Sequence, residues 1–409
     1  MRILSFVEGA RPRKGGLGLV WVPMIAKSLA DRGHTELLVI GGRVNPGQDA
    51  LVQPSLAFVP QIGSAGGWFG IFTFAAWGTW ACAPAMLWRL RRQARDADFI
   101  TLHSLYSFPV LAGYLLARFY RKPYGLWPHG VLLPVQREIS AGRKRIYDWL
   151  IARRILKQAA ALFFSGLGER EDAYKLGLTA PSVVIPHGFD SREFENLPSR
   201  GHFRAKYLDG HEGPLVLYLS RLNAKKGLDL LAKAFALVIR QVPNARLAIV
   251  GSGDPPAFAS QVRDWLHGCG VERCSVMTGL LTGQEKLQAF ADADVFVFPS
   301  EAENFGFAMF EAMASCIPVV VSNTLEYAGE VERSDAGLVV RRDAQEFASG
   351  IIKLLGNADL RRRMGKNGLV LARQFSWEKC GQSIERTLKC IMTGKPPPAD
   401  LAFRQSVQS

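Results

Sequence analysis

The sequence predicts an α/β protein made of two doubly wound parallel-sheet domains. Short apolar strands alternate with helical segments along the chain, and this alternation is typical of parallel sheets covered by helices on both faces. The alternation restarts after a polar stretch rich in helix-breaking residues, 191–213. The 409 residues are also enough to bury two hydrophobic cores. We therefore expect one domain in residues 1–198, a second in residues 199–375, a last helix in 376–393, and a disordered tail in 394–409.

The expected strands are short apolar runs that end at polar or glycine residues. In the first half these runs are residues 3–7, 36–40, 98–103, 124–127, 160–165 and 183–186. In the second half they are residues 215–220, 245–250, 274–278, 293–298 and 319–322. Helices are expected between them, for example at residues 20–31, 109–118, 228–241 and 305–314. Because open parallel sheets bind ligands beyond the carboxyl ends of their strands, polar residues at those ends are the candidates for function.

Residues 67–87 form a run of 21 residues without a charged side chain. The run is long enough to cross a bilayer, although Gly70, Gly78 and Pro84 interrupt it. The sequence leaves three interpretations open: a membrane-spanning helix, a helix buried in the core, or an apolar and aromatic face that rests on a membrane. The surrounding alternation of strands and helices argues against the first. The arginines in residues 89–95 could hold such a face against anionic lipid headgroups.

The composition points to anionic partners and excludes several classes of protein. A formal net charge of +14 attracts nucleotide phosphates, anionic lipids or nucleic acid, but no zinc-finger spacing or RNP-type motif supports a nucleic-acid partner. The six cysteines lack metal-ligand spacing and are expected to be reduced, and the opening strand at residues 1–7 is too short for a signal segment. We therefore expect a cytoplasmic protein, either free or peripheral on the inner face of the cytoplasmic membrane.

The most informative motif contains two glutamates, Glu303 and Glu311, eight positions apart. Glu303 follows a buried strand, whereas Glu311 lies inside the next helix, about 9 Å along its axis. The helix start offers free N–H groups and a positive dipole end to an anion, and Gly306 lets a ligand approach the backbone closely. The two carboxylates can thus flank a phosphate, as the hexose and ribose of a nucleotide sugar do. Two solvated glutamates without a ligand are the alternative interpretation.

A second motif places two cations after the expected strand at residues 215–220. Arg221 and Lys226 can clamp a pyrophosphate and stabilise the negative charge that grows on its bridging oxygen as it leaves. Because fixed cations of this kind can replace a divalent ion, we expect that neither a metal nor another cofactor is required.

Together, the two motifs resemble the signature of the retaining glycosyltransferases of family 4; they read Glu303-x7-Glu311 and Arg221-x4-Lys226-Gly227. The resemblance implies the GT-B fold, in which two Rossmann-like domains face one another across a cleft and a C-terminal helix returns to the N-terminal domain. It also implies that a hexose is moved, with retention of configuration, from a nucleoside diphosphate sugar to a glycan or lipid-linked acceptor. Enzymes of this kind act in cell-surface polysaccharide biosynthesis.

The resemblance also implies roles for residues of the C-terminal domain. Glu311 would bind the ribose hydroxyls, and Glu303 would act near the donor hexose. Arg221 and Lys226 would act on the departing diphosphate. Further donor contacts would come from Gly251, Asn304, Phe305, Gly306 and Phe307. The family often has glycine at the position of Asn304, but this difference removes no charged contact.

In the N-terminal domain the implied roles involve glycines and histidines. Gly15 and Gly16 would let the backbone approach the donor phosphate, and His129 would face the donor sugar as a catalytic residue. His103 is a further candidate, and the family's Ser-x3-Glu pattern is matched by Ser165 and Glu169. The implied reaction takes a front-face route in which the leaving phosphate helps to deprotonate the acceptor.

Two other functions remain open at this point. One is a GT-B relative with different nucleotide-sugar chemistry, such as an epimerase. The other is a basic, non-enzymatic adaptor at a membrane surface, although the presence of Glu303, Arg221 and Lys226 argues against it. The sequence names neither the sugar and base of the donor nor the acceptor and linkage.

Overall fold

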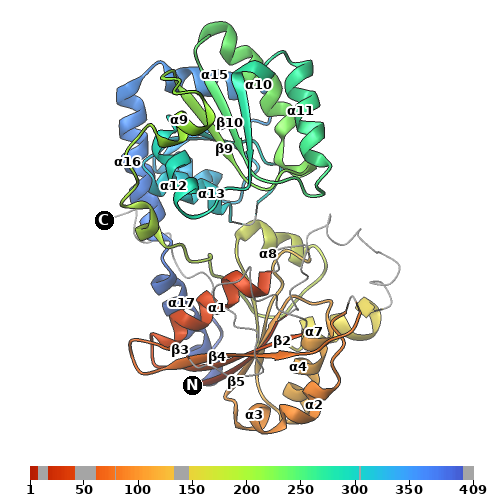
Figure 1. Cartoon of the computed structure of the whole chain (residues 1–409). Helices are drawn as coiled ribbons and strands as arrows, with labels where there is room; N and C mark the ends of the chain where they lie inside the picture. Colours follow the sequence, from red (N-terminus) through yellow and green to blue (C-terminus); the bar gives the residue numbers. More distant parts are fainter. Residues whose placement is uncertain (8–16, 42–60, 79, 133–146, 304, 399–409) are drawn as a thin grey trace. The chain divides into compact units, whose positions relative to one another are not determined.

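The computed structural model describes residues 1–7, 17–41, 61–78, 80–132, 147–303 and 305–398 (Figure 1). It divides into two compact units, residues 1–188 together with the segment from residue 377 onward, and residues 189–376. The first boundary therefore lies at 188/189 rather than at the expected 198/199. The reason is aromatic packing inside the second unit, where Phe189 contacts Phe310 and Phe194 contacts Phe290.

The first unit is built on a sheet whose described strands follow the order β3-β4-β2-β1-β5-β6-β7-β8. All neighbours are parallel except β3, which is antiparallel to β4. The bounds are β1 (Arg2–Val7), β2 (Thr35–Gly41), β3 (Gln61–Ile62), β4 (Trp68–Phe74), β5 (Phe99–His103), β6 (Tyr124–Trp127), β7 (Ala161–Phe164) and β8 (Ser182–Val184). The central strands are almost wholly buried, as expected for a parallel sheet with both faces covered.

Helices bury both faces of this sheet. Helix α1 (Leu17–Ala30) and helix α17 (Trp377–Met392) lie side by side on one face, and their Ile25 and Ile384 share a core with Trp127. The other face packs against α2 (Ala85–Arg89), α3 (Arg91–Asp96), α4 (Phe108–Phe119) and α7 (Arg153–Lys157). Among the described residues of this unit, the remaining helical segments are η1 (Asp148–Ala152) and α8 (Leu167–Tyr174). The last helix of the chain therefore belongs to the first unit, as the sequence predicted.

The uncharged run at residues 67–87 does not form one helix. It begins with β4, which pairs along its full length with β2, and it ends in the short helix α2. Of the three interpretations of this run, the single buried core helix and the single membrane-spanning helix were therefore wrong. The aromatic and β-branched residues of the run pack well on a pleated strand, which ends at Phe74, and Pro84 then caps the start of α2. In the part of the chain that the structure describes, no helix is both long and apolar enough to cross a membrane.

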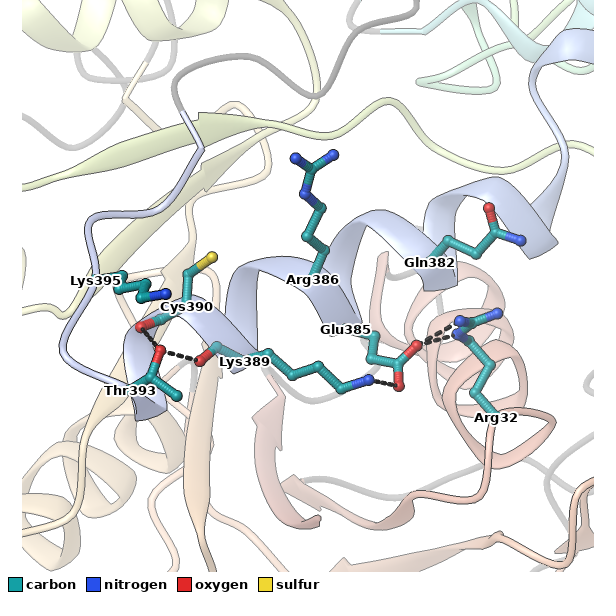
Figure 2. Close-up of a pocket in the computed structure, with 8 residues that line it drawn as sticks. All are labelled: Arg32, Gln382, Glu385, Arg386, Lys389, Cys390, Thr393 and Lys395. Atoms are coloured by element: carbon teal, nitrogen blue, oxygen red, sulfur yellow. Dashed lines mark hydrogen bonds and ion pairs between the residues drawn. The ribbon is translucent and has the colours of Figure 1, made fainter.

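A cluster of charges joins α17 to the end of α1 (Figure 2). The carboxylate of Glu385 accepts a hydrogen bond of 2.6 Å from Arg32 Nε, and Lys389 Nζ lies 2.7 Å from its Oε1. His34 Nε2 lies 3.3 Å from the same oxygen. Burial alone would raise the pKa of Glu385, but the hydrogen bonds from Lys389 and Arg32 outweigh it and hold the pKa at about 2. The hollow drawn in Figure 2 thus contains the ion pairs that anchor the returning helix, and its basic side chains outnumber its one carboxylate, Glu385.

The second unit has a wholly parallel sheet in the order β11-β10-β9-β12-β13-β14. Its strands are β9 (Leu215–Leu219), β10 (Arg246–Val250), β11 (Ser275–Gly279), β12 (Val295–Phe298), β13 (Val319–Ser322) and β14 (Gly337–Val340). Its helices are α9 (His202–Tyr207), α10 (Leu228–Gln241), α11 (Phe258–Gly268), α12 (Gly283–Asp292), α13 (Phe307–Ala314), α14 (Ala328–Arg333), α15 (Ala344–Leu355) and α16 (Ala358–Gln374), with short turns η2 (Ser191–Phe194), η3 (Ala224–Lys226) and η4 (Glu272–Cys274). Strand β14 was not predicted.

Candidate active site

Each sheet places candidate residues where its strand order reverses. In the second unit this point lies between β9 and β12, and in the first unit it lies between β1 and β5. Open parallel sheets bind ligands at such a switch point, beyond the carboxyl ends of the strands. Lys226 follows β9, Glu303 follows β12, and His103 ends β5. Each of the two units thus carries its own group of candidate site residues.

In the second unit, Lys226 and Glu303 form an ion pair between the loops that follow β9 and β12. Both side chains are shielded from water, with 11% and 17% of their surface exposed. The Lys226 ammonium also lies 5.5 Å from the ring centroid of Phe298. A backbone hydrogen bond of 2.8 Å from Glu301 N to Lys225 O ties the two loops together. The fold therefore brings one cation and one carboxylate together at the switch point.

Arg221 does not share this ion pair. Its Nη1 lies 3.0 Å from Asp254 Oδ2, and the two side chains are 64% and 40% exposed. Sequence reasoning missed Asp254, which lies in the loop after β10. Backbone hydrogen bonds between Leu222 and Ser252, and between Asp254 and Leu222, hold the two loops together. An ion pair this exposed contributes about 0–1 kcal/mol, so Arg221 can turn toward a ligand at little cost.

Three glycines allow these loops to approach one another. Gly227 has a φ of +67°, and a Cβ atom there would lie 2.4 Å from the carbonyl oxygen of Pro299. Gly251 has a φ of +147°, and its Cβ would lie 1.9 Å from the carbonyl oxygen of Ser220. Gly306 precedes α13 with a φ of +80°, which explains why the helix begins at Phe307 and not at residue 305. Gly251, one of the glycines predicted as donor contacts, thus has a packing role.

Glu311 is buried in α13 and contacts a lysine that the sequence did not reveal. Its Oε1 lies 3.1 Å from Nζ of Lys286 on α12, and both side chains are less than one-fifth exposed. Burial raises the pKa of Glu311, and the charge of Lys286 offsets this effect only in part. Lys286 lies on an amphipathic helix without a motif, so no local signal in the sequence pointed to it.

The phenylalanines beside Glu303 have mainly structural contacts. Phe305 is 3% exposed, and its ring stacks on Phe310 at a centroid distance of 4.3 Å. It also packs against Tyr327 and near Phe307. Only the backbone of Phe305 is therefore suited to contact a ligand. This packing fixes the start of α13, where the helix offers its N–H groups.

In the first unit, three buried histidines stack at the carboxyl ends of β5, β6 and β8. His103 Nδ1 lies 3.0 Å from His129 Nε2, and the ring of His129 stacks on His187 at 6.0 Å. Trp127 stacks on His129 at a centroid distance of 5.9 Å. Burial lowers the pKa of His103 to about 3 and that of His187 to about 4, and burial together with the other two histidines lowers the pKa of His129. All three rings are therefore neutral near pH 7.

Glu169 holds the turn that carries His129. Its Oε1 accepts a hydrogen bond of 2.5 Å from Gly130 N, and its Oε2 accepts hydrogen bonds from the backbone and hydroxyl of Ser165. His129 itself has a φ of +52°, a backbone conformation that costs about 1–3 kcal/mol in a residue other than glycine. Glu169 thus stabilises a strained turn, which gives the Ser165 and Glu169 match a physical role.

Three predicted site residues, Gly15, Gly16 and Asn304, lie outside the described residues. Within the described ranges, no group of three or more His, Cys, Asp or Glu side chains could hold a metal ion. The described candidates therefore form a cation and carboxylate site in the second unit and a neutral histidine row in the first.

Each of the two units matches a model of a known protein family. Residues 16–188 match the model described as a glycosyl transferase 4-like domain, and residues 199–370 match the model of glycosyl transferases group 1. A relative from Mycobacterium tuberculosis, a GDP-mannose-dependent alpha-(1-6)-phosphatidylinositol monomannoside mannosyltransferase, is 30% identical over 64% of this chain and 72% of its own length. The chain belongs to the group 1 glycosyltransferases.

One further relative and one solved structure are also similar to this chain. The phosphatidyl-myo-inositol mannosyltransferase of Mycobacterium leprae is 27% identical over 76% of this chain and 79% of its own length. The crystal structure of Anabaena HepE in complex with UDP and glucose superposes with a TM-score of 0.71 at 20% identity, covering 95% of this chain and 99% of that one. This likeness shows that the two units have the GT-B fold.

Proposed function

We propose that this glycosyltransferase moves a hexose, with retention of configuration, from a nucleoside diphosphate sugar to a glycan or lipid-linked acceptor. The observation that carries the proposal is the Lys226–Glu303 ion pair at the β9/β12 switch point, with Glu311 about one turn along the helix that follows. Relatives named as GDP-mannose-dependent and as acting on phosphatidylinositol derivatives support both the donor and the acceptor class. We place the reaction in cell-surface polysaccharide or glycolipid synthesis.

The charges of the second unit suit a departing diphosphate. Lys226 would neutralise charge on the phosphates, and Arg221 would join it by leaving Asp254. Glu311 would leave Lys286 and accept hydrogen bonds from the ribose hydroxyls. The bond from the anomeric carbon to the phosphate oxygen breaks while the bond to the acceptor oxygen forms on the same face. The acceptor proton passes to the leaving phosphate, so these residues supply charge and position and no metal is needed.

A surface of the first unit suits contact with an anionic membrane. Trp88 on α2 and Phe119 at the end of α4 are 58% and 78% exposed, although their side chains are large and apolar. Neighbouring helix α3 presents Arg92 and Arg95, whose side chains are 85% and 66% exposed. Apolar rings beside arginines are the composition of a membrane-surface contact. We propose that the enzyme binds peripherally to the cytoplasmic membrane through this surface and meets a lipid-linked acceptor there.

Turnover of a panel of UDP-, GDP- and ADP-sugars tests the proposed donor class. One donor class should release its nucleoside diphosphate, and the anomeric configuration of the product, determined by NMR, should match that of the donor. Lys226→Ala should lower turnover at least tenfold, because a lost charge contact costs about 1.4 kcal/mol or more of barrier. Lys225→Ala, which removes the neighbouring lysine, is the matched control and should retain activity.

Other outcomes of the same assay would favour other functions. Conversion of the donor into an isomeric nucleotide sugar, without release of nucleotide, would indicate an epimerase. No turnover, combined with binding to anionic vesicles, would indicate the membrane adaptor. Wild-type turnover in Lys226→Ala would refute the role of the ion pair.

A further inference from the structure

A chain of hydrogen bonds crosses the sheet of the first unit and ends at His129. The Glu36 carboxyl on β2 accepts a hydrogen bond from Ser5 on β1, and Ser5 Oγ lies 2.5 Å from Thr101 Oγ1 on β5. Thr101 Oγ1 lies 3.3 Å from Nε2 of His103, whose Nδ1 lies 3.0 Å from Nε2 of His129. Polar atoms of five residues are thus connected across three adjacent strands, β2, β1 and β5, and the turn after the next strand, β6.

Every residue of this hydrogen-bond chain is buried. The exposed fractions run from 0% at Ser5 to 8% at His129, and Glu36, the one charged residue of β2, is 2% exposed. A buried polar group left without a partner costs about 1–3 kcal/mol, so apolar residues would serve the core better. One oxygen of Glu36, Oε2, has no hydrogen-bond partner among the described residues. Packing alone therefore does not account for an acid at this position.

An ionised Glu36 fixes the donor and the acceptor of every hydrogen bond between Glu36 and His129. A carboxylate only accepts hydrogen bonds, so Ser5 donates to Glu36, and Thr101 donates to Ser5. Thr101 then has a free lone pair for the Nε2–H group of His103. A neutral imidazole carries one N–H group, so Nδ1 of His103 becomes an acceptor, and His129 donates to it from Nε2.

A protonated or amide group at residue 36 would not impose this direction. It can donate a hydrogen bond to Ser5, and the donor and acceptor of every later hydrogen bond can then exchange roles. His103 would carry its proton on Nδ1 and donate to Nε2 of His129, whose own proton would lie on Nδ1. Burial raises the pKa of Glu36 to about 7, and the hydrogen bond from Ser5 offsets this only in part. The ionised form therefore predominates above neutral pH.

We propose that Glu36, acting through Ser5, Thr101 and His103, holds His129 as the Nε2–H tautomer, which makes Glu36 a positioning residue. The consequence for catalysis rests on the proposed function, in which His129 faces the donor sugar. In this tautomer Nδ1 of His129 is an acceptor. It suits a sugar hydroxyl that donates a hydrogen bond, and it would reject a group that can only accept.

Nitrogen-15 NMR of the histidine rings tests the proposal without substrate. At about pH 8.5, above the raised pKa of Glu36, the wild-type protein should show His103 and His129 as single Nε2–H tautomers. Thr101→Val preserves side-chain shape but cuts the chain, so both rings should become mixtures of tautomers. Thr101→Ser should restore the single tautomer. Ser28→Ala, which removes a buried hydroxyl bonded only to the carbonyl of Ile25, is the matched control.

The outcomes separate this inference from the proposed function. A wild-type His129 that carries its proton on Nδ1, or a Thr101→Val spectrum identical to the wild type, would overturn the inference even if the protein transfers sugar. Unchanged tautomer selection in Glu36→Gln would overturn it as well, and this variant keeps the size of the buried side chain if Thr101→Val fails to fold. Tautomer selection without any sugar transfer would leave the inference standing and refute the proposed function.

Discussion

Replacing Glu385 by glutamine removes the charge that joins α17 to the end of α1 while preserving the size of the side chain (Figure 2). Arg32 and Lys389 then lose their common partner, while the apolar face of the returning helix keeps its contacts. We expect the variant to fold and the first unit to lose stability.

The size of the expected loss in stability follows from the pKa of Glu385. The hydrogen bonds from Lys389 and Arg32 hold this pKa at about 2 against an ordinary value of 4.5, a difference that corresponds to about 3 kcal/mol at neutral pH. Lys389 is 65% exposed and Arg32 is 29% exposed, so solvent screening reduces the net contribution to about 1–2 kcal/mol. Because the folded-state pKa is depressed, this stability is present above pH 4.5 and is lost as the pH falls toward 2.

Hydrogen exchange measured residue by residue tests whether the loss of stability occurs in α17. At pH 7 the amides of α17 should exchange about 5–30-fold faster in Glu385→Gln, the factor that corresponds to 1–2 kcal/mol. Unfolding by urea should show the same loss at pH 7 and a smaller one near pH 3.5. Glu378→Gln, an exposed position in the first turn of the same helix, is the control. Equal exchange in α17 for Glu385→Gln and the wild type would refute the proposed anchor.

Three further outcomes test other parts of the account. Glu169→Ala leaves the N–H groups of Gly130 and Ser165 without their acceptor, so urea unfolding should show a loss of about 2–4 kcal/mol; a loss below 0.5 kcal/mol would show that the turn does not depend on it. Activity should survive excess EDTA, and a loss that manganese or magnesium restores would show that a metal stabilises the leaving group. The protein should co-sediment with anionic vesicles at low salt and be released at high salt, and replacement of Arg92 and Arg95 by Glu should weaken binding. Equal binding to neutral vesicles would contradict the proposed membrane surface.

The sequence predicted the fold well because the fold depends on local patterns. The apolar runs around Val297 and Leu217 fit buried parallel strands, and the structure confirms them. Polar residues such as Lys226 and Glu303 meet because parallel strands end at the same edge of the sheet. The roles of these residues in catalysis remain predictions.

Features that depend on long-range packing were missed. The aromatic run at Trp68 fits a buried helix or a buried strand equally well, and only its pairing with β2 decides between them. The contact of Glu311 with Lys286 joins two helices whose relative rotation no local pattern encodes. Glu36 did leave a signal, since it is a lone acid in an apolar strand, but its connection to His129 requires the order of four strands.

The central claim is that the second unit binds the nucleoside diphosphate part of a nucleotide sugar beyond the ends of β9 and β12. Calorimetric titration with UDP, GDP and ADP tests it directly, because it requires no knowledge of the sugar or the acceptor. We predict saturable binding of one of these nucleotides with a Kd below about 1 mM, at least tenfold weaker binding in Lys226→Ala and Glu311→Gln, and wild-type affinity in Lys225→Ala. The claim would be contradicted if none of the three nucleotides bound, or if both site variants bound as tightly as the wild type.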